Sequence, residues 1–204
     1  MLIAVIANPH IKTRRELLKL AKELRGTGAT ATIIIGNLGL DPEEYSKYLP
    51  NTYFLSGAED DIRITKQARK LNALLDGNIV ELNGITVAGV GGIDPHQNME
   101  RILRLVKEET LSKRVNVTLS YHPPRDCGDL IETIKVRRGL DELREFIREL
   151  RPSVHVCGGE YLDTCLINVT KTYVLGKGEA LALIHNDEGT ITVKVLPLRF
   201  RRTT

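Results

Sequence analysis

The sequence predicts a single layered α/β (α+β) domain, and three observations lead to this prediction. Short runs rich in β-branched residues alternate with longer amphipathic segments, which is the pattern of strands and helices packed around sheets. The length of 204 residues suits one domain and is enough to bury roughly 70% of the unfolded surface. No Pro-, Gly- or Ser-rich linker and no internal repeat divides the chain. We therefore expect one domain over residues 1–198 and a basic tail over residues 199–204.

The first part of the chain predicts a βαβ unit. Residues 2–7 and 31–35 are continuous apolar, β-branched runs of the kind that form fully buried strands. The segment between them is amphipathic and predicts a helix. The residues expected on its buried face are Leu17, Leu18, Ala21 and Leu24.

The middle of the chain predicts a strand at residues 53–55 and a helix near residues 60–75. A hairpin is expected from Ile79 to Val90, because Asn83-Gly84 favours a two-residue turn. The buried face of the helix is expected to carry Ile64, Ala68, Leu71 and Leu75.

A helix near residues 96–111 and a strand over 115–120 are expected next, followed by a helix that Pro152 ends. The buried face of this last helix is marked by Leu140, Leu143, Phe146, Ile147 and Leu150. The remaining chain predicts a β-rich closing part, because its apolar residues form short alternating runs. These runs lie at residues 154–157, 165–169, 172–175, 180–184 and 190–195.

Composition limits the classes of function and location. No segment approaches the ~20 apolar residues that cross a bilayer, and no basic region precedes the apolar residues 1–7, so we expect a cytoplasmic protein without a membrane partner. The cysteines, Cys127, Cys157 and Cys165, are odd in number and lack C-x-x-C spacing, so we expect reduced thiols. The aromatic content of 4%, with no Trp, argues against base stacking as the main surface function.

Several predicted strands end in unusual polar or glycine-rich segments. The segments are Asn8-Pro9-His10, Gly36-Asn37, Gly57-Ala58-Glu59-Asp60, Tyr121-His122-Pro123 and Gly158-Gly159-Glu160-Tyr161. Ligand-binding groups collect at the carboxyl ends of strands in α/β sheets. These five segments are therefore expected to surround one cleft.

Their order and spacing resemble the five motifs of the calcineurin-like metallophosphoesterases, D-x-H, G-D, G-N-H-[DE], a single His and G-H-x-H. The resemblance runs from residue 2 to about residue 175. It implies a four-layer α/β/β/α fold with two mixed sheets between helices. It also implies a site for two divalent metals, drawn from Mn, Fe, Zn or Ni.

The motif positions carry different residues in this chain. The family's aspartates fall on Asn8 and Asn37, and its catalytic histidine falls on Glu59. The histidine of the first motif falls on His10, and the single histidine falls on His122. The remaining metal ligands fall on Ala58, Gly159 and Tyr161.

These replacements remove charge from the expected site. Two divalent ions about 3.5–4 Å apart need anionic oxygens between them, above all a bridging carboxylate. Asn8 and Asn37 supply neutral amides, and Ala58 and Gly159 supply no ligand. We therefore expect no bound metal pair and no catalytic residue, and a non-catalytic ligand-binding or scaffold protein whose ligand is a phosphate-containing molecule or a protein. The ring of Tyr161 is expected to fill the space of the missing ions.

Two alternatives stay open. The first is a metal-dependent phosphoesterase, acting on phosphomonoesters or phosphodiesters, whose remodelled site holds one ion on His10, His122 and Glu59. Asp60, Glu160 or Asp163 could supply further charge to that ion. The second is a nucleic-acid-binding accessory protein that uses the basic tail.

Four further features have simpler explanations. His155 is expected to be a hydrogen-bonded core residue, and the run from Gly89 to Gly92 a permissive turn. Cys127 lies near His122 in sequence, but without a visible third group we do not expect a nucleophile. The basic loop residues Arg125, Lys135, Arg137 and Arg138 are expected to be solvated.

Overall fold

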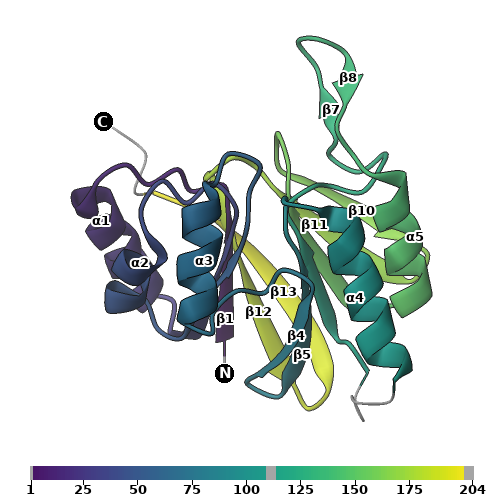
Figure 1. Ribbon diagram of the computed structural model, residues 1–204, viewed down its shortest axis with the longest axis horizontal. Helices are drawn as coiled ribbons and strands as arrows, with labels where there is room; N and C mark the ends of the chain where they lie inside the picture. Colours follow the sequence, from purple (N-terminus) through teal and green to yellow (C-terminus); the bar gives the residue numbers. More distant parts are fainter. Residues whose placement is uncertain (1, 109–113, 200–204) are drawn as a thin grey trace.

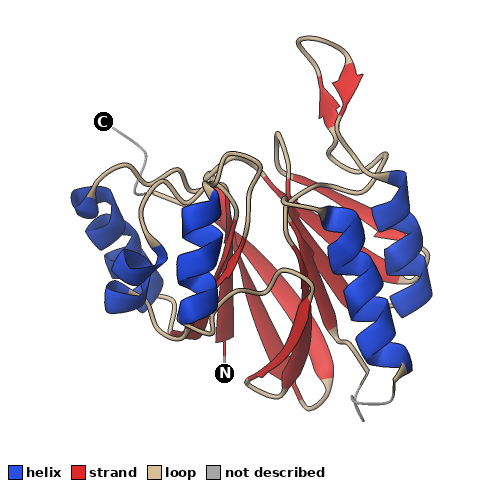
Figure 2. Ribbon diagram, in the orientation of Figure 1, coloured by secondary structure: helices blue, strands red, loops and turns tan. Residues whose placement is uncertain are grey.

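A computed structural model describes residues 2–108 and 114–199 of the chain. Two large mixed sheets face each other, with helices on their outer sides (Figures 1 and 2). The predicted four-layer α/β/β/α architecture is thereby confirmed. No helix in the described part of the chain is long and apolar enough to cross a membrane.

The first sheet has the order β13-β12-β1-β2-β3. Its parallel strands β1, β2 and β3 come from the first part of the chain, and the expected βαβ unit is present. β12 joins the sheet antiparallel to β1. The strands span Leu2–Ala7 (β1), Ala29–Ile35 (β2), Thr52–Leu55 (β3), Ala180–Asp187 (β12) and Thr190–Pro197 (β13).

The second sheet has the order β10-β11-β9-β6-β5-β4. The expected hairpin is formed by β4 and β5, and β5, β6, β9 and β11 run parallel. The strands span Asn78–Leu82 (β4), Ile85–Val90 (β5), Val117–Ser120 (β6), Val154–Gly158 (β9), Asp163–Ile167 (β10) and Thr170–Leu175 (β11). The long segment 123–138 contains a small hairpin of β7 (Leu130–Ile131) and β8 (Val136–Arg137).

The helices are α1 (Arg14–Arg25), α2 (Pro42–Tyr48), α3 (Ile62–Lys70), α4 (Pro95–Lys107) and α5 (Asp141–Leu150). α1 begins with a capping box between Thr13 and Glu16, which satisfies two backbone N–H groups at the helix start. The prediction that Leu18 is buried is wrong: Leu18 is 43% exposed, and Leu20 packs in its place. The short α2 was not predicted, because seven residues with only Pro42 and Tyr45 buried give no helical period.

The helix expected near residues 60–75 is shorter than predicted. α3 ends at Lys70, Leu71 is its 39% exposed cap, and the next residues return to the first sheet through a bridge from Leu74 to Phe54. The helix expected over 96–111 ends at Lys107, and residues 109–113 lie outside the described residues.

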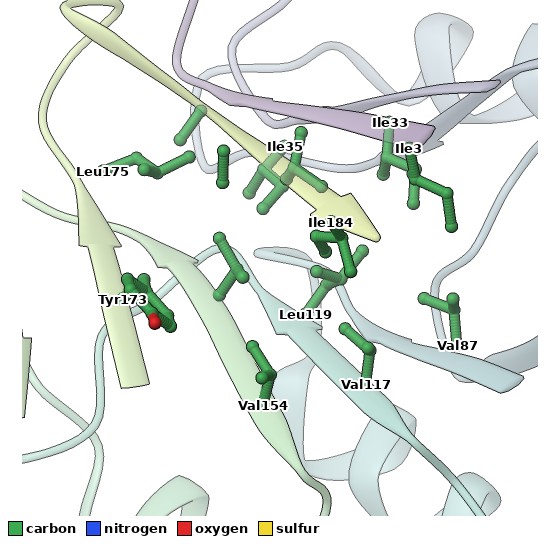
Figure 3. Close-up of a cluster of buried hydrophobic side chains, with 14 of the residues drawn as sticks. Ile3, Ile33, Ile35, Val87, Val117, Leu119, Val154, Tyr173, Leu175 and Ile184 are labelled. Atoms are coloured by element: carbon green, nitrogen blue, oxygen red, sulfur yellow. The ribbon is translucent and has the colours of Figure 1, made fainter. Parts of the chain in front are cut away.

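Three apolar layers hold the elements together. The central layer lies between the two sheets and contains residues such as Ile33, Leu119 and Ile184 (Figure 3). A second cluster joins the first sheet to α1, α2 and α3, and a third joins the second sheet to α4 and α5. Both faces are covered at the central parallel strands β1, β5, β6 and β9, which are therefore continuous apolar runs, whereas β13 and β10 remain partly exposed.

The expectation of reduced cysteines is wrong for two of the three. Cys127 and Cys165 form a disulfide across 38 residues of chain, while Cys157 is free and buried. Cys127 therefore has no thiol to act as a nucleophile. The odd count misled the prediction, because it forbids complete pairing but not one pair.

Candidate functional site

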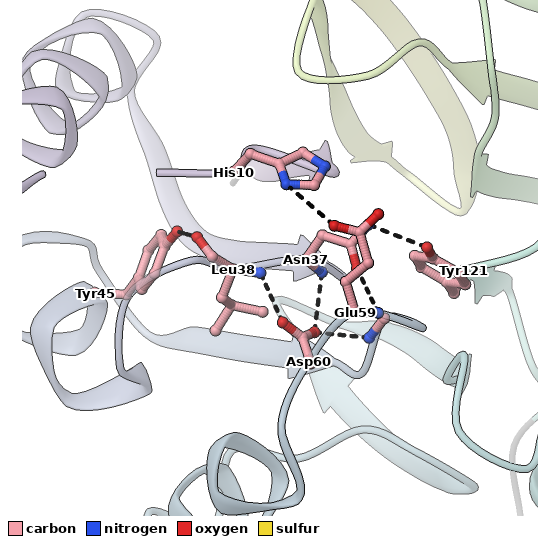
Figure 4. A network of polar contacts seen from close by, with 8 residues as sticks. His10, Asn37, Leu38, Tyr45, Glu59, Asp60 and Tyr121 are labelled. Carbon is pink, nitrogen blue, oxygen red and sulfur yellow. Dashed lines mark hydrogen bonds and ion pairs between the residues drawn. The ribbon is translucent and has the colours of Figure 1, made fainter. Parts of the chain in front are cut away.

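The carboxyl ends of β1, β2, β3, β6 and β9 surround a pocket of about 460 Å³. Six of the eight residues expected at the cleft line it, namely Asn8, Asn37, Ala58, Glu59, His122 and Gly159. His10 lies beside this pocket, with its Nδ1 3.8 Å from Glu59 Oε2 (Figure 4). Tyr161 is not among the lining residues and is 40% exposed, so its ring does not fill the site as expected.

The polar strand ends adopt backbone conformations that most residues avoid. Asn8, His10 and Asn37 have φ values of 49°, 44° and 45°, in the left-handed region. Asn tolerates this region better than most residues, whereas a His there is uncommon. The chain therefore turns sharply after β1 and after β2.

Asn37 connects the two sheets through both atoms of its amide. Its Nδ2 donates to Tyr121 Oη at 3.1 Å, and its Oδ1 accepts from the backbone N–H of Glu59 at 3.1 Å (Figure 4). Asn37 follows β2 and Tyr121 follows β6, so the first bond crosses between the sheets. An ionised carboxylate accepts hydrogen bonds only, so an aspartate could not reproduce the donor side of this arrangement.

Asp60 is bound by the backbone of the same loops. Its carboxylate accepts N–H groups from Asn37 and Leu38, each at 2.9 Å, and from Gly57 at 2.7 Å. Burial raises the pKa of Asp60, and the three N–H groups counteract part of that rise. Sequence reasoning considered Asp60 only as a source of charge for a metal, whereas here it fixes the backbone of two motif loops.

Tyr121 is the aromatic residue that occupies the site. Its ring lies against Gly92, where an added Cβ would come within 2.6 Å of it, and against Gly36. The run from Gly89 to Gly92 is thus not a permissive turn: Gly89 and Val90 belong to β5, and Gly92 is small because Tyr121 packs on it.

His122 is half-buried, and its ring meets the edge of the Tyr121 ring with centroids 4.9 Å apart. Burial lowers the pKa of His122; a hydrogen bond with the Gly92 backbone opposes part of this shift, and the nearby Arg138 adds to it. The imidazole is therefore held neutral at neutral pH.

The opposite wall of the pocket carries a group of charges that sequence reasoning did not bring together. Glu160 accepts from Lys177 at 2.8 Å and from Arg138 at 3.5 Å. Asp129, only 1% exposed, pairs with Arg137 at 2.7 Å. Arg138 was expected to be solvated with the rest of its loop, and Lys177 gave no signal because it lies in none of the five motifs.

The other basic loop residues have acidic neighbours from their own region. Arg125 lies 3.4 Å from Asp141, and Lys135 pairs with Glu132 at 2.5 Å. These contacts are exposed, and such pairs contribute about 0–1 kcal/mol each.

His155 is a core residue. It is fully buried in β9, with Nδ1 2.8 Å from Thr118 Oγ1 and Nε2 3.1 Å from Ser120 Oγ. Ser120 Oγ donates to the backbone oxygen of His122, so it accepts from His155, and Nε2 carries the proton. Burial lowers the pKa of His155 to about 3.

The described residues do not bring three His, Cys, Asp or Glu side chains together in a group that could hold a metal ion. His10 and Glu59 are near each other, but His122 is not grouped with them. Asn8 Oδ1 is buried and meets no hydrogen-bond donor within the described part of the chain.

No family model and no curated protein sequence matches this chain. Several solved structures do match its fold. Protein TT1561 of Thermus thermophilus has a TM-score of 0.69 at 18% identity, over 95% of this chain and 97% of that one. A Streptococcus pneumoniae TIGR4 protein described as a predicted phosphoesterase has a TM-score of 0.50 at 14% identity, over 96% and 88%.

Purple acid phosphatase PPD1 from yellow lupin (Lupinus luteus) seeds has a TM-score of 0.57 at 8% identity. That match covers 97% of this chain and 51% of the phosphatase, so this chain spans about half of the larger enzyme. At such low identities the similarity concerns the fold. Together with the two facing sheets and the pocket at the strand ends, these structures show that the chain has the fold of the calcineurin-like metallophosphoesterases.

Proposed function

We propose that this protein is a non-catalytic relative of the metallophosphoesterases that keeps the pocket at the strand ends as a binding site. The observation that carries the proposal is the hydrogen bonding of Asn37, at the position of the family's bridging carboxylate. Its Nδ2 donates to Tyr121 and its Oδ1 accepts from Glu59 N–H. The residue that should bridge two metals instead joins two loops of the protein.

The other donors do not fit a metal pair either. The carboxylate of Asp60 is engaged by three backbone N–H groups, and Ala58 and Gly159 have no ligand atom in their side chains. Two divalent cations about 3.5–4 Å apart would lack the anionic oxygens that offset their repulsion. We therefore derive no catalytic step through metals at this site.

The pocket retains features that suit a ligand. Its walls combine the amides of Asn8 and Asn37 with the charged groups of Glu160, Arg138 and Lys177. Arg138 and Lys177 both contact the carboxylate of Glu160, so an anionic group of a ligand can take the place of Glu160 at one of these cations. This favours a phosphate-containing ligand or an acidic segment of a partner protein.

A hydrolysis assay tests the proposal. Purified protein supplied with Mn²⁺, Ni²⁺ or Zn²⁺ should hydrolyse an aryl phosphodiester and an aryl phosphomonoester no faster than buffer does, and elemental analysis should find no stoichiometric metal. His122→Ala and the control His96→Ala, at an exposed position on α4, should then be indistinguishable. Metal-dependent turnover that His122→Ala abolishes and His96→Ala preserves would refute the proposal.

The second candidate is a phosphoesterase with a remodelled site, favoured by the approach of His10 to Glu59 at 3.8 Å. An imidazole and a carboxylate are adequate ligands for one ion, although a third ligand is needed. The nucleic-acid alternative depends on the basic tail, of which residues 200–204 lie outside the described residues. Salt-dependent binding of RNA or DNA that is lost on deleting residues 199–204 would support it.

A further inference from the structure

The Cys127–Cys165 disulfide connects the wall of the pocket to the edge of the second sheet. Cys127 directly precedes Gly128 and Asp129, which both line the pocket. Cys165 lies in β10, the edge strand of that sheet. We call residues 123–140 the pocket loop, because Pro123, Gly128, Asp129, Arg138 and Leu140 all line the pocket.

Many contacts of the pocket loop are made within the loop itself. Arg138 N–H donates to the backbone oxygen of Asp129 at 2.9 Å, and Arg137 pairs with the Asp129 carboxylate. The small hairpin of β7 and β8 projects away from the two sheets (Figure 1). These contacts keep the loop's shape but do not attach it to the sheet.

The loop also contacts the body of the protein at several points. Arg144 of α5 donates to the backbone oxygen of Arg125 at 2.8 Å, and Gly128 packs on Val174 of β11. Arg138 reaches Glu160 through an exposed pair at 3.5 Å. Pairs of that kind are weak. The disulfide is a covalent cross-link to β10, and it lies next to Gly128 and Asp129, which both line the pocket.

The third cysteine lies beside this disulfide without exchanging with it. Cys157 of β9 is packed in one cluster with Cys127 and Val174, against Cys165. Burial raises the pKa of the Cys157 thiol far above its usual range, and the thiol points to the backbone oxygen of Tyr173. Exchange requires a thiolate, so Cys157 leaves the Cys127–Cys165 pairing intact.

The two sulfurs differ in access. Cys127 is fully buried, whereas Cys165 is half-buried on an edge strand. A reductant from solution therefore attacks the sulfur of Cys165 and releases Cys127 first.

We propose that the Cys127–Cys165 disulfide is a redox control of the pocket, opened by a dithiol reductant. The thiolate of the reductant attacks Cys165 Sγ, the S–S bond breaks, and Cys127 leaves as a thiolate that takes up a proton. The second thiol of the reductant then attacks the mixed disulfide and releases Cys165. Two electrons and two protons pass to the protein, and the dithiol becomes a disulfide.

Reduction separates the pocket loop from β10 and lets Asp129 and Arg138 move away from the pocket wall. The inference rests on the proposed function only in treating the pocket as a binding site. The change in the loop itself requires no ligand and no catalytic activity.

Hydrogen–deuterium exchange of the full chain, oxidised and then reduced with dithiothreitol, tests this inference. Reduction should accelerate exchange in residues 123–140 and in β10 by at least about tenfold and leave β1 and β2 unchanged. Cys165→Ala should exchange like the reduced protein without any reductant. Cys157→Ala is the matched control and should keep the full response to dithiothreitol.

Alkylation in denaturant without reductant, followed by intact-mass measurement, should find one free thiol, and the same treatment with reductant should find three. Equal exchange of residues 123–140 in the oxidised and reduced protein would overturn the inference, and so would three free thiols at the start. The comparison of oxidised and reduced wild-type protein tests the inference even if Cys165→Ala does not fold. Phosphoesterase activity would refute the proposed function and leave this result untouched.

Discussion

Burial of a neutral imidazole in β9 should make the stability of this protein depend on pH. The ring of His155 is hydrogen-bonded at both nitrogens, to Thr118 and Ser120, and its pKa is lowered from 6.5 to about 3 by burial. Between these two values the unfolded chain binds a proton that the folded chain does not. The free energy of unfolding therefore falls as the pH is lowered from 6.5 toward 3.

The size of the effect follows from the shift. Each pH unit within this interval changes the free energy of unfolding by about 1.4 kcal/mol through His155. At pH 5, which is about 1.5 units below the unfolded pKa, the loss relative to pH 8 is about 2 kcal/mol. Urea unfolding at pH 8, 6 and 5, fitted with one common slope of free energy against urea concentration, measures this loss of stability.

The variant His155→Gln isolates this contribution. It should be less stable than wild type at pH 8, because buried hydrogen bonds are lost, but its free energy of unfolding should fall less between pH 6 and pH 5, by about 1.2 kcal/mol. Asp60 and Asp76, whose pKa values are raised by burial, act in the opposite direction and cancel in the comparison. His96→Gln, at an exposed position, should keep the wild-type slope. If His155→Gln also kept the wild-type dependence of stability on pH, the assignment of that dependence to His155 would be refuted.

Three further predictions concern the site. Asn37→Asp should lower the free energy of unfolding by about 1–3 kcal/mol, since it loses the donor to Tyr121 and buries a charge beside Asp60. The control Asn72→Asp, at an exposed position, should change the free energy of unfolding by less than about 0.5 kcal/mol, and urea denaturation of both variants measures the two values. EDTA should leave the thermal midpoint within about 1 °C of its value without EDTA in a calorimeter, and a clear drop would reveal a structural metal. Gly36→Ala should destabilise more than Gly28→Ala, because both have positive φ but only Gly36 lies against the Tyr121 ring; equal midpoints would contradict the packing of Tyr121.

The architecture could be predicted from the amino-acid sequence because the signals for it are local. Alternation of β-branched runs with amphipathic segments marks strands and helices, and the Asn83-Gly84 turn marks a hairpin. The polar strand ends could be assigned for a related reason, since the carboxyl ends of parallel strands meet at one edge of a sheet. The charge missing at Asn8 and Asn37 follows directly from residue type.

What takes the place of that charge depends on contacts between distant parts of the chain. The bond from Asn37 to Tyr121 joins residues 84 positions apart, and the Cys127–Cys165 disulfide joins residues separated by 38 positions. Neither pair follows a helical or strand period, so no local pattern could indicate that Tyr121, rather than Tyr161, occupies the site. Which side chains meet at the pocket depends on how the two sheets face each other, and that arrangement is set by the burial of their apolar faces over the whole chain.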